Sequence, residues 1–338
     1  MNICLNTYPW AFGIPGGGEQ QLHFYRDALI RGSEKWPSLN IELFDQWQPK
    51  FDKMQLMHYF SCMPSSLDFL DVVKARRGIP LLISPNFWPE PEDWKASGVY
   101  DDVNSILWLA DKIVVNSFIE EEALVRLCKI DSSRISVIHN AVQDCFFSPI
   151  DPALFRDKYN VDGPFILNIG NVEPRKNQFA FLKALKEFPT LQLITIGGVR
   201  ENWYLNACKE EGGEQFRLID PLPPGSELLR SAIAGCEFFA MPSLRETPSI
   251  ASLEAGAAGA KILTTDLGST TEYFQDYADY VNPYDIVSMS EGIGAALAKE
   301  KNDGLSLRIK ELYRWDVVVE KLVDTYSGLI GTDLRVKK

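Results

Sequence analysis

The chain has 338 residues, more than one small domain needs, so two domains of ordinary size are expected. Its 46% hydrophobic and 12% aromatic content is typical of globular proteins, and its net charge of −12 argues against a nucleic-acid binder. No apolar run reaches membrane-spanning length and the N-terminus has no signal-peptide pattern, so we expect a cytoplasmic protein whose membrane contact is at most peripheral, at the inner face.

The six cysteines are scattered and show no C-x-x-C spacing for a metal or redox site. Cys4, Cys128 and Cys236 lie in apolar runs, which predicts buried, reduced thiols.

The first half of the chain alternates short apolar strands with helices. Strands are predicted at residues 2–6, 40–44, 55–60, 80–84, 112–116 and 135–139, and helices at 20–31, 65–76, 101–110 and 118–128. The segment from Pro85 to Trp94 contains three prolines and predicts a shaped loop. This alternation favours a parallel sheet wrapped by helices.

Residues 143–163 have no clean period, so we place the domain boundary near them. The alternation then restarts, with strands predicted at residues 165–169, 191–196, 216–219, 236–241, 261–265 and 280–281, and helices at 177–188, 201–211, 225–234, 270–275, 285–299 and in the tail at 304–329. The sequence therefore predicts two doubly wound α/β domains with a cleft between them, lined by the loops at the carboxyl ends of the strands.

Residues 241–259 read as a strand end, a loop with Glu246, and a helix on which Glu254 lies. Thr247 suits an N-cap and Pro248 the first helical position, so the amides of Ser249 and Ile250 are expected to lack intrahelical partners. Such a helix start favours a phosphate, and the flanking carboxylates favour a ligand rich in hydroxyls. An exposed helix face with two glutamates is the alternative interpretation.

Three other strand-end loops carry candidate residues. Gly16, Gly17 and Gly18 open the first helix, where a backbone without side chains can approach a ligand, although a flexible turn fits equally. The G-x-G-x-x-G pattern is absent here, which removes the usual fingerprint of a dinucleotide-dependent dehydrogenase. In the second half, Arg175 and Lys176 could neutralise a diphosphate or belong to a solvated turn. Residues 266–271, DLGSTT, suit a ligand or a plain turn, and we favour the turn.

Taken in order, these residues resemble family 4 of the glycosyltransferases, a retaining group with the GT-B fold. The resemblance covers nearly the whole chain: PGGGEQQL, VVNSFIEEEAL, SVIHNAVQDCFFSP, NIGNVEPRKN and FAMPSLRETPSIASLEAGAAG all take part, and Glu246 with Glu254 forms its Glu-x7-Glu signature. It implies two facing Rossmann-like domains with a deep interdomain cleft. Residues 1–155 would form the acceptor domain, completed by a crossover helix at about 312–330, and residues 156–311 the donor domain.

The resemblance also implies roles. Lys176 and Arg175 would hold the donor diphosphate, Ser249 and Ile250 would offer backbone amides to it, and Glu254 would accept hydrogen bonds from ribose hydroxyls. Glu246 would lie near the transferred sugar. The remaining donor-site residues, at the first-helix start and in the loops beside the two glutamates, would be Gly16, Gly17, Gly18, Asn171, Thr247 and Pro248.

No protein nucleophile, cofactor or metal is implied, and no Asp-x-Asp metal signature occurs in a suitable loop. A hexose would pass from a UDP- or GDP-linked donor to a hydroxyl of a saccharide or glycoconjugate, in polysaccharide or glycoconjugate biosynthesis.

The chain departs from the family pattern at three places. Asn171 stands where an Arg is frequent, so Arg175 has to supply the second cation. Thr247-Pro248-Ser249 replaces the usual glycine-containing loop after Glu246, and Asn86 stands near the place of a frequent His. The acceptor is expected against His58, Asn86 and Trp88, with Trp94 nearby; aromatic side chains there suit either sugar stacking or core packing, and His58 suits a ligand or a structural role.

Two competing hypotheses are considered, and these departures motivate the first. The first is a catalytically weak homologue that acts as a binding or partner subunit. The second is a GT-B sugar-nucleotide epimerase, which needs more acid and base residues than the chain offers. The nucleotide base, the sugar and the oligomeric state cannot be read from the sequence.

Overall fold

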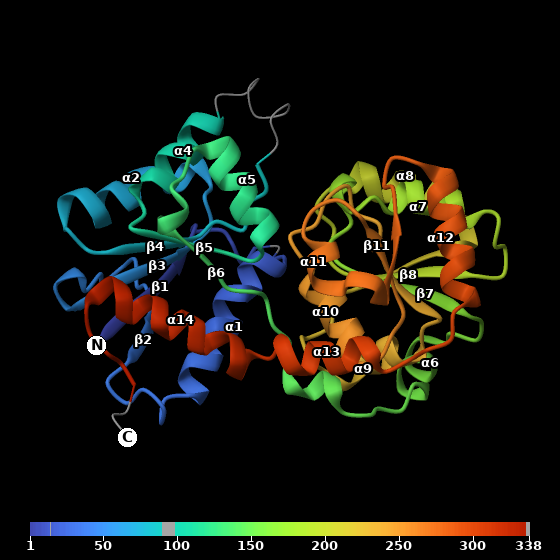
Figure 1. The fold of residues 1–338 in the computed structure, drawn as a ribbon. Coiled ribbons are helices and arrows are strands. Elements are labelled where there is room, and N and C mark those ends of the chain that lie inside the picture. The colour runs from blue at the N-terminus through green and yellow to red at the C-terminus, as the bar shows by residue number, and fades with distance from the viewer. Residues whose placement is uncertain (14, 90–98, 336–338) are drawn as a thin grey trace. The chain divides into compact units, whose positions relative to one another are not determined.

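The computed structural model describes residues 1–13, 15–89 and 99–335. The chain folds into two compact units. Unit 1 comprises Met1–Asn140 and Trp315–Lys338, and unit 2 comprises Ala141–Arg314. Each unit is built around its own parallel sheet (Figure 1). The units divide at Asn140 and at Arg314, whereas the sequence placed the boundaries at residues 155 and 311.

Unit 1 contains a six-stranded parallel sheet in the order β2-β1-β3-β4-β5-β6. Its strands are β1 (Asn2–Thr7), β2 (Asn40–Leu43), β3 (Leu56–Phe60), β4 (Leu81–Ser84), β5 (Lys112–Val115) and β6 (Ile135–Val137). The helices described around it are α1 (Gly17–Arg31), α2 (Leu67–Asp71), α4 (Val99–Leu109), α5 (Phe118–Cys128) and α14 (Trp315–Ile330).

The alternation of side chains along these strands separates two apolar faces. On β3, Met57 and Tyr59 pack into a core shared with α2, α4 and α5. The next residues in the alternation, His58 and Phe60, face the rings of Tyr25 from α1 and Tyr326 from α14. The two helices α1 and α14 pack against each other, so the last helix completes the unit formed by the first residues (Figure 1).

Unit 2 contains a second six-stranded parallel sheet, in the order β12-β11-β10-β7-β8-β9. Its strands are β7 (Phe165–Ile169), β8 (Gln192–Ile196), β9 (Phe216–Ile219), β10 (Phe238–Met241), β11 (Ile262–Thr265) and β12 (Ala278–Val281). Its helices are α6 (Ala153–Tyr159), α7 (Gln178–Leu185), α8 (Asn202–Gly212), α9 (Glu227–Gly235), α10 (Ile250–Ala257), α11 (Thr270–Phe274), α12 (Ile286–Ala298) and α13 (Gly304–Leu312).

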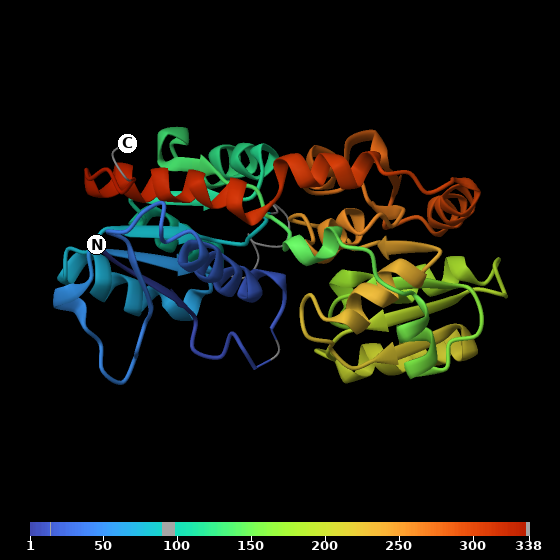
Figure 2. The same ribbon diagram turned by 90° about the horizontal axis from the view of Figure 1, so that it is seen from below.

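Helices cover both faces of this sheet (Figure 2). Phe165 and Leu167 of β7 pack with α9, α10, α11 and α13, while Ile166 between them packs with α7, α8 and α12. A strand buried on both faces needs apolar residues at every position, which is why these strands read as continuous apolar runs in the sequence.

The predicted α/β fold with two doubly wound sheets is confirmed, and each predicted strand has a counterpart. One helix was not predicted, and one predicted helix is not α-helical along its whole length. The unpatterned stretch 143–163 contains α6, and the helix expected at 65–76 begins as a short turn, continues as α2 and ends in a wider π-helical turn at Val72–Arg76. Part of the shaped loop predicted from Pro85 to Trp94 lies outside the described residues, and so does Trp94.

The predicted reduced cysteines are confirmed, because Cys4, Cys128 and Cys236 are buried thiols outside any disulfide. Among the helices of the described ranges, none has the length and apolar character needed to cross a membrane.

Candidate functional site

The order of strands in unit 2 picks out one place on the sheet. The chain runs outward from β7 to β8 and β9, and then returns to the other side of β7 with β10. In open parallel sheets, ligands bind where the strand order reverses in this way, at the carboxyl ends of the two strands. Here these ends continue into the β7–α7 loop, with Lys176, and the β10–α10 loop, with Glu246.

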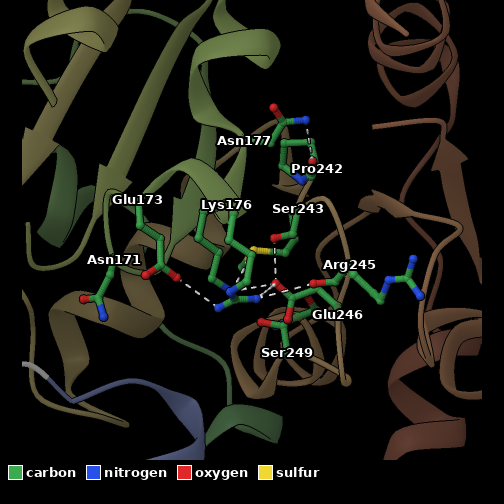
Figure 3. Close-up of polar contacts among 12 residues, drawn as sticks. Asn171, Glu173, Lys176, Asn177, Pro242, Ser243, Arg245, Glu246 and Ser249 are labelled. Atoms are coloured by element: carbon green, nitrogen blue, oxygen red, sulfur yellow. Dashed lines mark hydrogen bonds and ion pairs between the residues drawn. The ribbon is translucent and has the colours of Figure 1, made fainter. Parts of the chain in front are cut away.

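Lys176 and Glu246 form a buried ion pair between these two loops (Figure 3). The Lys176 ammonium lies 2.6 Å from Oε1 of Glu246, and the two residues are only 9% and 3% exposed. The hydroxyl of Ser243 donates to the same oxygen at 2.6 Å. A carboxylate that accepts from an ammonium and a hydroxyl inside the protein is held in one orientation.

The charges of the pair explain its protonation. Burial favours the neutral form of Glu246, but the positive charges of Lys176 and Arg175 outweigh it, so the pKa of Glu246 is lowered overall and the side chain is a carboxylate. Burial lowers the pKa of Lys176, and the adjacent Glu246 works against that shift. We therefore treat the pair as ionised at neutral pH.

A second carboxylate extends this cluster. Glu173 lies 3.0 Å from the guanidinium of Arg175 through Oε1 and 3.3 Å from that of Arg200 through Oε2. Arg175 also reaches Glu246 at 3.5 Å. Two carboxylates and three cations thus alternate along one side of the site, with a surplus of positive charge that suits an anionic ligand.

Sequence reasoning missed Glu173 and Arg200. Glu173 was visible beside the two cations in NIGNVEPRKN, and Arg200 follows the paired glycines at the end of the adjacent strand β8.

The loop after β11 fixes the backbone of Glu246. Its amide donates to the carbonyl of Leu267 at 3.2 Å, and its carbonyl accepts from the amide of Ser269 at 2.8 Å. Gly268 between them has φ +101°, and a Cβ there would lie 2.0 Å from the Glu246 carbonyl oxygen. The DLGSTT segment, which we favoured as a plain turn, is therefore the backbone partner of Glu246.

The helix after Glu246 begins later than predicted. Its N-cap is Ser249, whose hydroxyl accepts from the amide of Ser252 at 3.3 Å, and Ile250 is its first residue. Thr247 is therefore not the N-cap, and Pro248 is not at the first helical position. The reason is that pairing with the 267–269 backbone keeps the chain extended at Glu246. The first amides of α10 still lack intrahelical acceptors, so its N-terminus remains an anion site in principle.

Glu254 lies within α10, more than one turn after the first residue Ile250, and is only 5% exposed. Burial raises its pKa to about 8. Among the described residues, no side chain or backbone group donates a hydrogen bond to its carboxyl group. A buried carboxyl group without a protein donor suits a ligand with hydroxyls to donate.

The glycine loop of unit 1 is held by its own residues. The amide of Gly16 donates to Oε2 of Glu19 at 2.7 Å, and the hydroxyl of Tyr8 donates to Oε1 at 2.6 Å. Gly16 is the N-cap of α1, as expected from a glycine at a helix start. This loop follows β1, beside the place where the strand order of the first sheet reverses between β1 and β3.

The predicted acceptor residues of unit 1 have other partners. Asn86 has φ +48°; its Nδ2 donates to the carbonyl of Gly18 at 3.3 Å, and its Oδ1 accepts from Asn116 at 3.3 Å. It thereby supports the start of α1. Trp88 is half-buried next to the last described residue of its segment.

His58 does not reach a ligand surface. It is fully buried, where its ring nitrogens lie 2.7 Å from the hydroxyl of Tyr326 and 2.8 Å from that of Ser84. Burial lowers its pKa well below the usual range, so the ring is neutral. The interpretation as an acceptor ligand is replaced by a structural role, joining β3 and β4 to α14.

The fold matches solved structures across both units. Sucrose-phosphate synthase from Thermosynechococcus elongatus aligns with a TM-score of 0.77 at 16% identity, covering 98% of this chain and 99% of that one. Anabaena HepE in complex with UDP-glucose aligns with a TM-score of 0.78 at 16% identity, covering 97% and 100%. The lipopolysaccharide-biosynthesis glycosyltransferase WaaG aligns with a TM-score of 0.71 at 12% identity, covering 97% and 100%. The chain has the GT-B fold of these enzymes.

One family model matches the part of the chain that contains most of unit 2. Residues 153–311, which include both loops of the ion pair, match the sequence model of the family described as Glycosyl transferases group 1.

The chain is also similar to curated proteins that are named as glycosyltransferases. D-inositol 3-phosphate glycosyltransferase from Mycobacterium sp. (strain JLS) is 28% identical over 166 residues, which are 47% of this chain and 38% of that protein. The enzyme of that name from Xylanimonas cellulosilytica is 25% identical over 270 residues, 72% of this chain and 62% of its own length. The matched regions thus span about two fifths to three fifths of these relatives.

Proposed function

We propose that the protein is a retaining glycosyltransferase that moves a hexose from a UDP- or GDP-linked donor to a saccharide hydroxyl, in the assembly of a polysaccharide or glycoconjugate. The observation that carries the proposal is the Lys176–Glu246 pair at the reversal point of the second sheet. It lies within the segment that matches the group 1 glycosyl transferases.

Several residues of the site have a role in binding the donor in this proposal. Lys176 and Arg175 bind the diphosphate, together with the amides at the start of α10 beside Ser249. Glu254 accepts hydrogen bonds from the ribose. The same loops supply Asn171, Thr247, Pro248 and Ile250 as further donor contacts, and Gly16, Gly17 and Gly18 contribute backbone contacts from unit 1.

The reaction needs no protein nucleophile. The bond between the sugar C1 and the diphosphate oxygen breaks, and its electron pair stays on the diphosphate. The acceptor oxygen attacks C1 from the same face and forms the new glycosidic bond, and its proton passes to the departing diphosphate oxygen. Lys176 stabilises the negative charge that grows on that oxygen, which is the largest kind of contribution a fixed charge makes to catalysis.

The proposal requires no metal, because Lys176 and Arg175 supply the positive charge. Within the described residues, no three His, Cys, Asp or Glu side chains gather as a possible metal site. Because Lys176 and Arg175 neutralise the diphosphate in this proposal, activity is expected to persist in EDTA.

The direct test has two stages. A thermal-shift screen with UDP, GDP and ADP identifies the nucleotide, because a bound product raises the melting temperature by mass action. Turnover is then measured with the matching sugar nucleotides by product analysis, with and without saccharide acceptors. We expect Lys176→Ala and Glu246→Ala to lose about 100-fold or more in turnover, while Lys186→Ala, an exposed cation of the same unit, stays active.

Wild-type turnover in Lys176→Ala or Glu246→Ala would contradict the assignment. The absence of binding to every nucleotide and sugar nucleotide would support the competing hypothesis of a partner subunit, whose motivation is Asn171 and the Thr247-Pro248-Ser249 loop.

A further inference from the structure

We propose that Asn177, the residue after Lys176, is a positioning residue that sets Lys176 and Glu246 against each other by joining three strand-end loops of unit 2. The inference rests on the proposed function, since its consequence for turnover assumes that Lys176 binds the donor diphosphate. Asn177 is itself 8% exposed, and both of its side-chain bonds are to protein carbonyls.

The backbone of Asn177 marks a sharp change of direction. The short helical turn Pro174–Lys176 ends at Asn177, where φ is +60° and ψ is 25°, and α7 begins at the next residue. Asn is one of the few residues other than Gly that adopt this left-handed conformation readily. The turn presents Lys176 to the site and sends the chain into α7.

The side chain of Asn177 does what Gly in the same conformation cannot do. Its Nδ2 donates to the carbonyl of Pro242 at 3.1 Å, in the β10–α10 loop (Figure 3). The same nitrogen donates to the carbonyl of Pro283 at 2.7 Å, in the β12–α12 loop. A carboxamide nitrogen has two hydrogens, so both bonds form at once. Neither carbonyl lies in the loop of Asn177 itself.

A second bond joins the same two loops on the other side of Lys176. The amide of Leu244 donates to the carbonyl of Arg175 at 2.9 Å. Both chain neighbours of Lys176, Arg175 and Asn177, therefore form hydrogen bonds to the β10–α10 loop. Their partners, Leu244 and Pro242, are the two chain neighbours of Ser243, so Lys176 and Ser243 are each bracketed by these two bonds. These two bracketed side chains are the ones that donate to Oε1 of Glu246 at 2.6 Å each.

This arrangement has a chemical consequence. A charge that stabilises a transition state is effective only where it is held in place before the reaction, and small displacements reduce the rate strongly. Without the two bonds of Asn177, the Pro242 carbonyl is released and Lys176 keeps a cross-loop bond at only one neighbour, so its ammonium is less firmly fixed relative to the β10–α10 loop. The loss should appear mainly in kcat, because binding of the donor to the remaining cations and amides is retained.

The test compares Asn177→Gly with Asn160→Gly. Asn160 provides a matched control, since it has φ +51° at the end of α6 in the same unit and an exposed side chain. Both substitutions replace a left-handed Asn by Gly, but only Asn177→Gly removes the cross-loop bonds. Asn177→Asp is the second variant, because it keeps the shape and places an oxygen where the donor was.

Two readouts are used. In Asn177→Gly, we expect kcat to fall about 10- to 100-fold with a smaller change in donor KM. The second readout is the rate at which an amine-reactive ester acylates Lys176, followed by peptide mass spectrometry. That rate should rise in Asn177→Gly because the side chain, 11% exposed and paired with Glu246 in the native protein, is less restrained. Asn160→Gly should leave both readouts unchanged.

A merely structural role would lower the melting temperature of Asn177→Gly and leave kcat and Lys176 acylation at wild-type values below that temperature; this result would overturn the proposal. If wild-type protein turned over no sugar nucleotide, the proposed function would fail, and the acylation rates of the Asn177 and Asn160 variants would still decide whether Asn177 positions Lys176.

Discussion

Glu254 lies on the apolar helix α10, and no cation of the described residues forms an ion pair with its carboxyl group. Burial raises its pKa to about 8, so the folded protein binds this proton more tightly than the unfolded chain, whose Glu residues titrate in their ordinary range. The stability associated with the neutral form is fully present below that ordinary range and is lost as the pH rises through about 8.

Glu254→Gln should remove this pH dependence. Relative to the variant, the wild-type free energy of unfolding should fall by about 1.4 kcal/mol per pH unit across the window that ends near pH 8. Urea unfolding of both proteins at intervals from pH 5 to pH 9 measures the difference. If the free energy of unfolding changed with pH in the same way in both proteins, the prediction would be wrong, and the Glu254 carboxylate would be stabilised in the folded protein.

The Lys176–Glu246 pair allows a second prediction at this scale. Glu246→Gln leaves the Lys176 ammonium buried without its carboxylate and should cost about 3 kcal/mol. Lys176→Met should cost less, because Arg175, 3.5 Å from Oε1, still balances Glu246. The double variant should recover part of the loss of Glu246→Gln, since neither charge is then left without the other.

Urea unfolding of the two single variants and the double variant at pH 7 forms a double-mutant cycle. Losses in the single variants that simply add in the double variant would contradict a direct interaction between the two side chains.

At the scale of elements, strands were easier to predict than helix ends. Strands such as β7 are buried on both faces and therefore appear as apolar runs. Helix α6 is short, and its Phe155 is buried. The amide of Phe155 donates a hydrogen bond to the hydroxyl of Ser231 in α9 at 2.9 Å. A helix stabilised by a residue so distant in sequence leaves little local signal.

The start of α10 was mispredicted for the same physical reason. Thr247-Pro248 is a good local start for a helix, but the backbone of Glu246 is paired with the segment around Gly268 and stays extended. A contact between separate loops thus overrides the local preference. The two glutamates and Lys176 could be found from sequence because their residue types carry charge, whereas Gly268 and Asn177 act through geometry that only the fold reveals.

Gly268→Ala tests the contact directly. A Cβ there would lie 2.0 Å from the Glu246 carbonyl oxygen, so the substitution should separate the two loops, lower stability and reduce turnover. Gly259→Ala is the matched control, because Gly259 also has a positive φ of +79° but a Cβ there meets nothing within 4 Å. Both variants pay the backbone cost, and only Gly268→Ala adds the clash. Equal melting temperatures and equal turnover for the two variants would argue against a role for the 267–269 segment.

At the scale of the whole molecule, the chain passes between the units twice, after Asn140 and after Arg314. The expectation that a C-terminal helix completes the first unit came from a resemblance, and α14 packs on α1 with Trp315 against Tyr25, their ring centroids 5.0 Å apart. Composition alone could not have predicted that the last helix packs on the first unit. The structural role of His58 could not be predicted for the same reason, since its partner Tyr326 belongs to α14, near the other end of the sequence.

Because each unit has its own sheet and core, a nucleotide that binds the β7–α7 and β10–α10 loops should stabilise unit 2 in particular. At a nucleoside diphosphate concentration of 100 Kd, the free energy of opening should rise by about 2.7 kcal/mol. Amide hydrogen exchange, read strand by strand with and without the nucleotide, should slow in β7 and β10, with β4 and β5 of unit 1 unchanged. Lys176→Ala should show little slowing at the same concentration. Equal slowing in both sheets would mean that the units open together, and slowing confined to unit 1 would place the nucleotide outside the site proposed here.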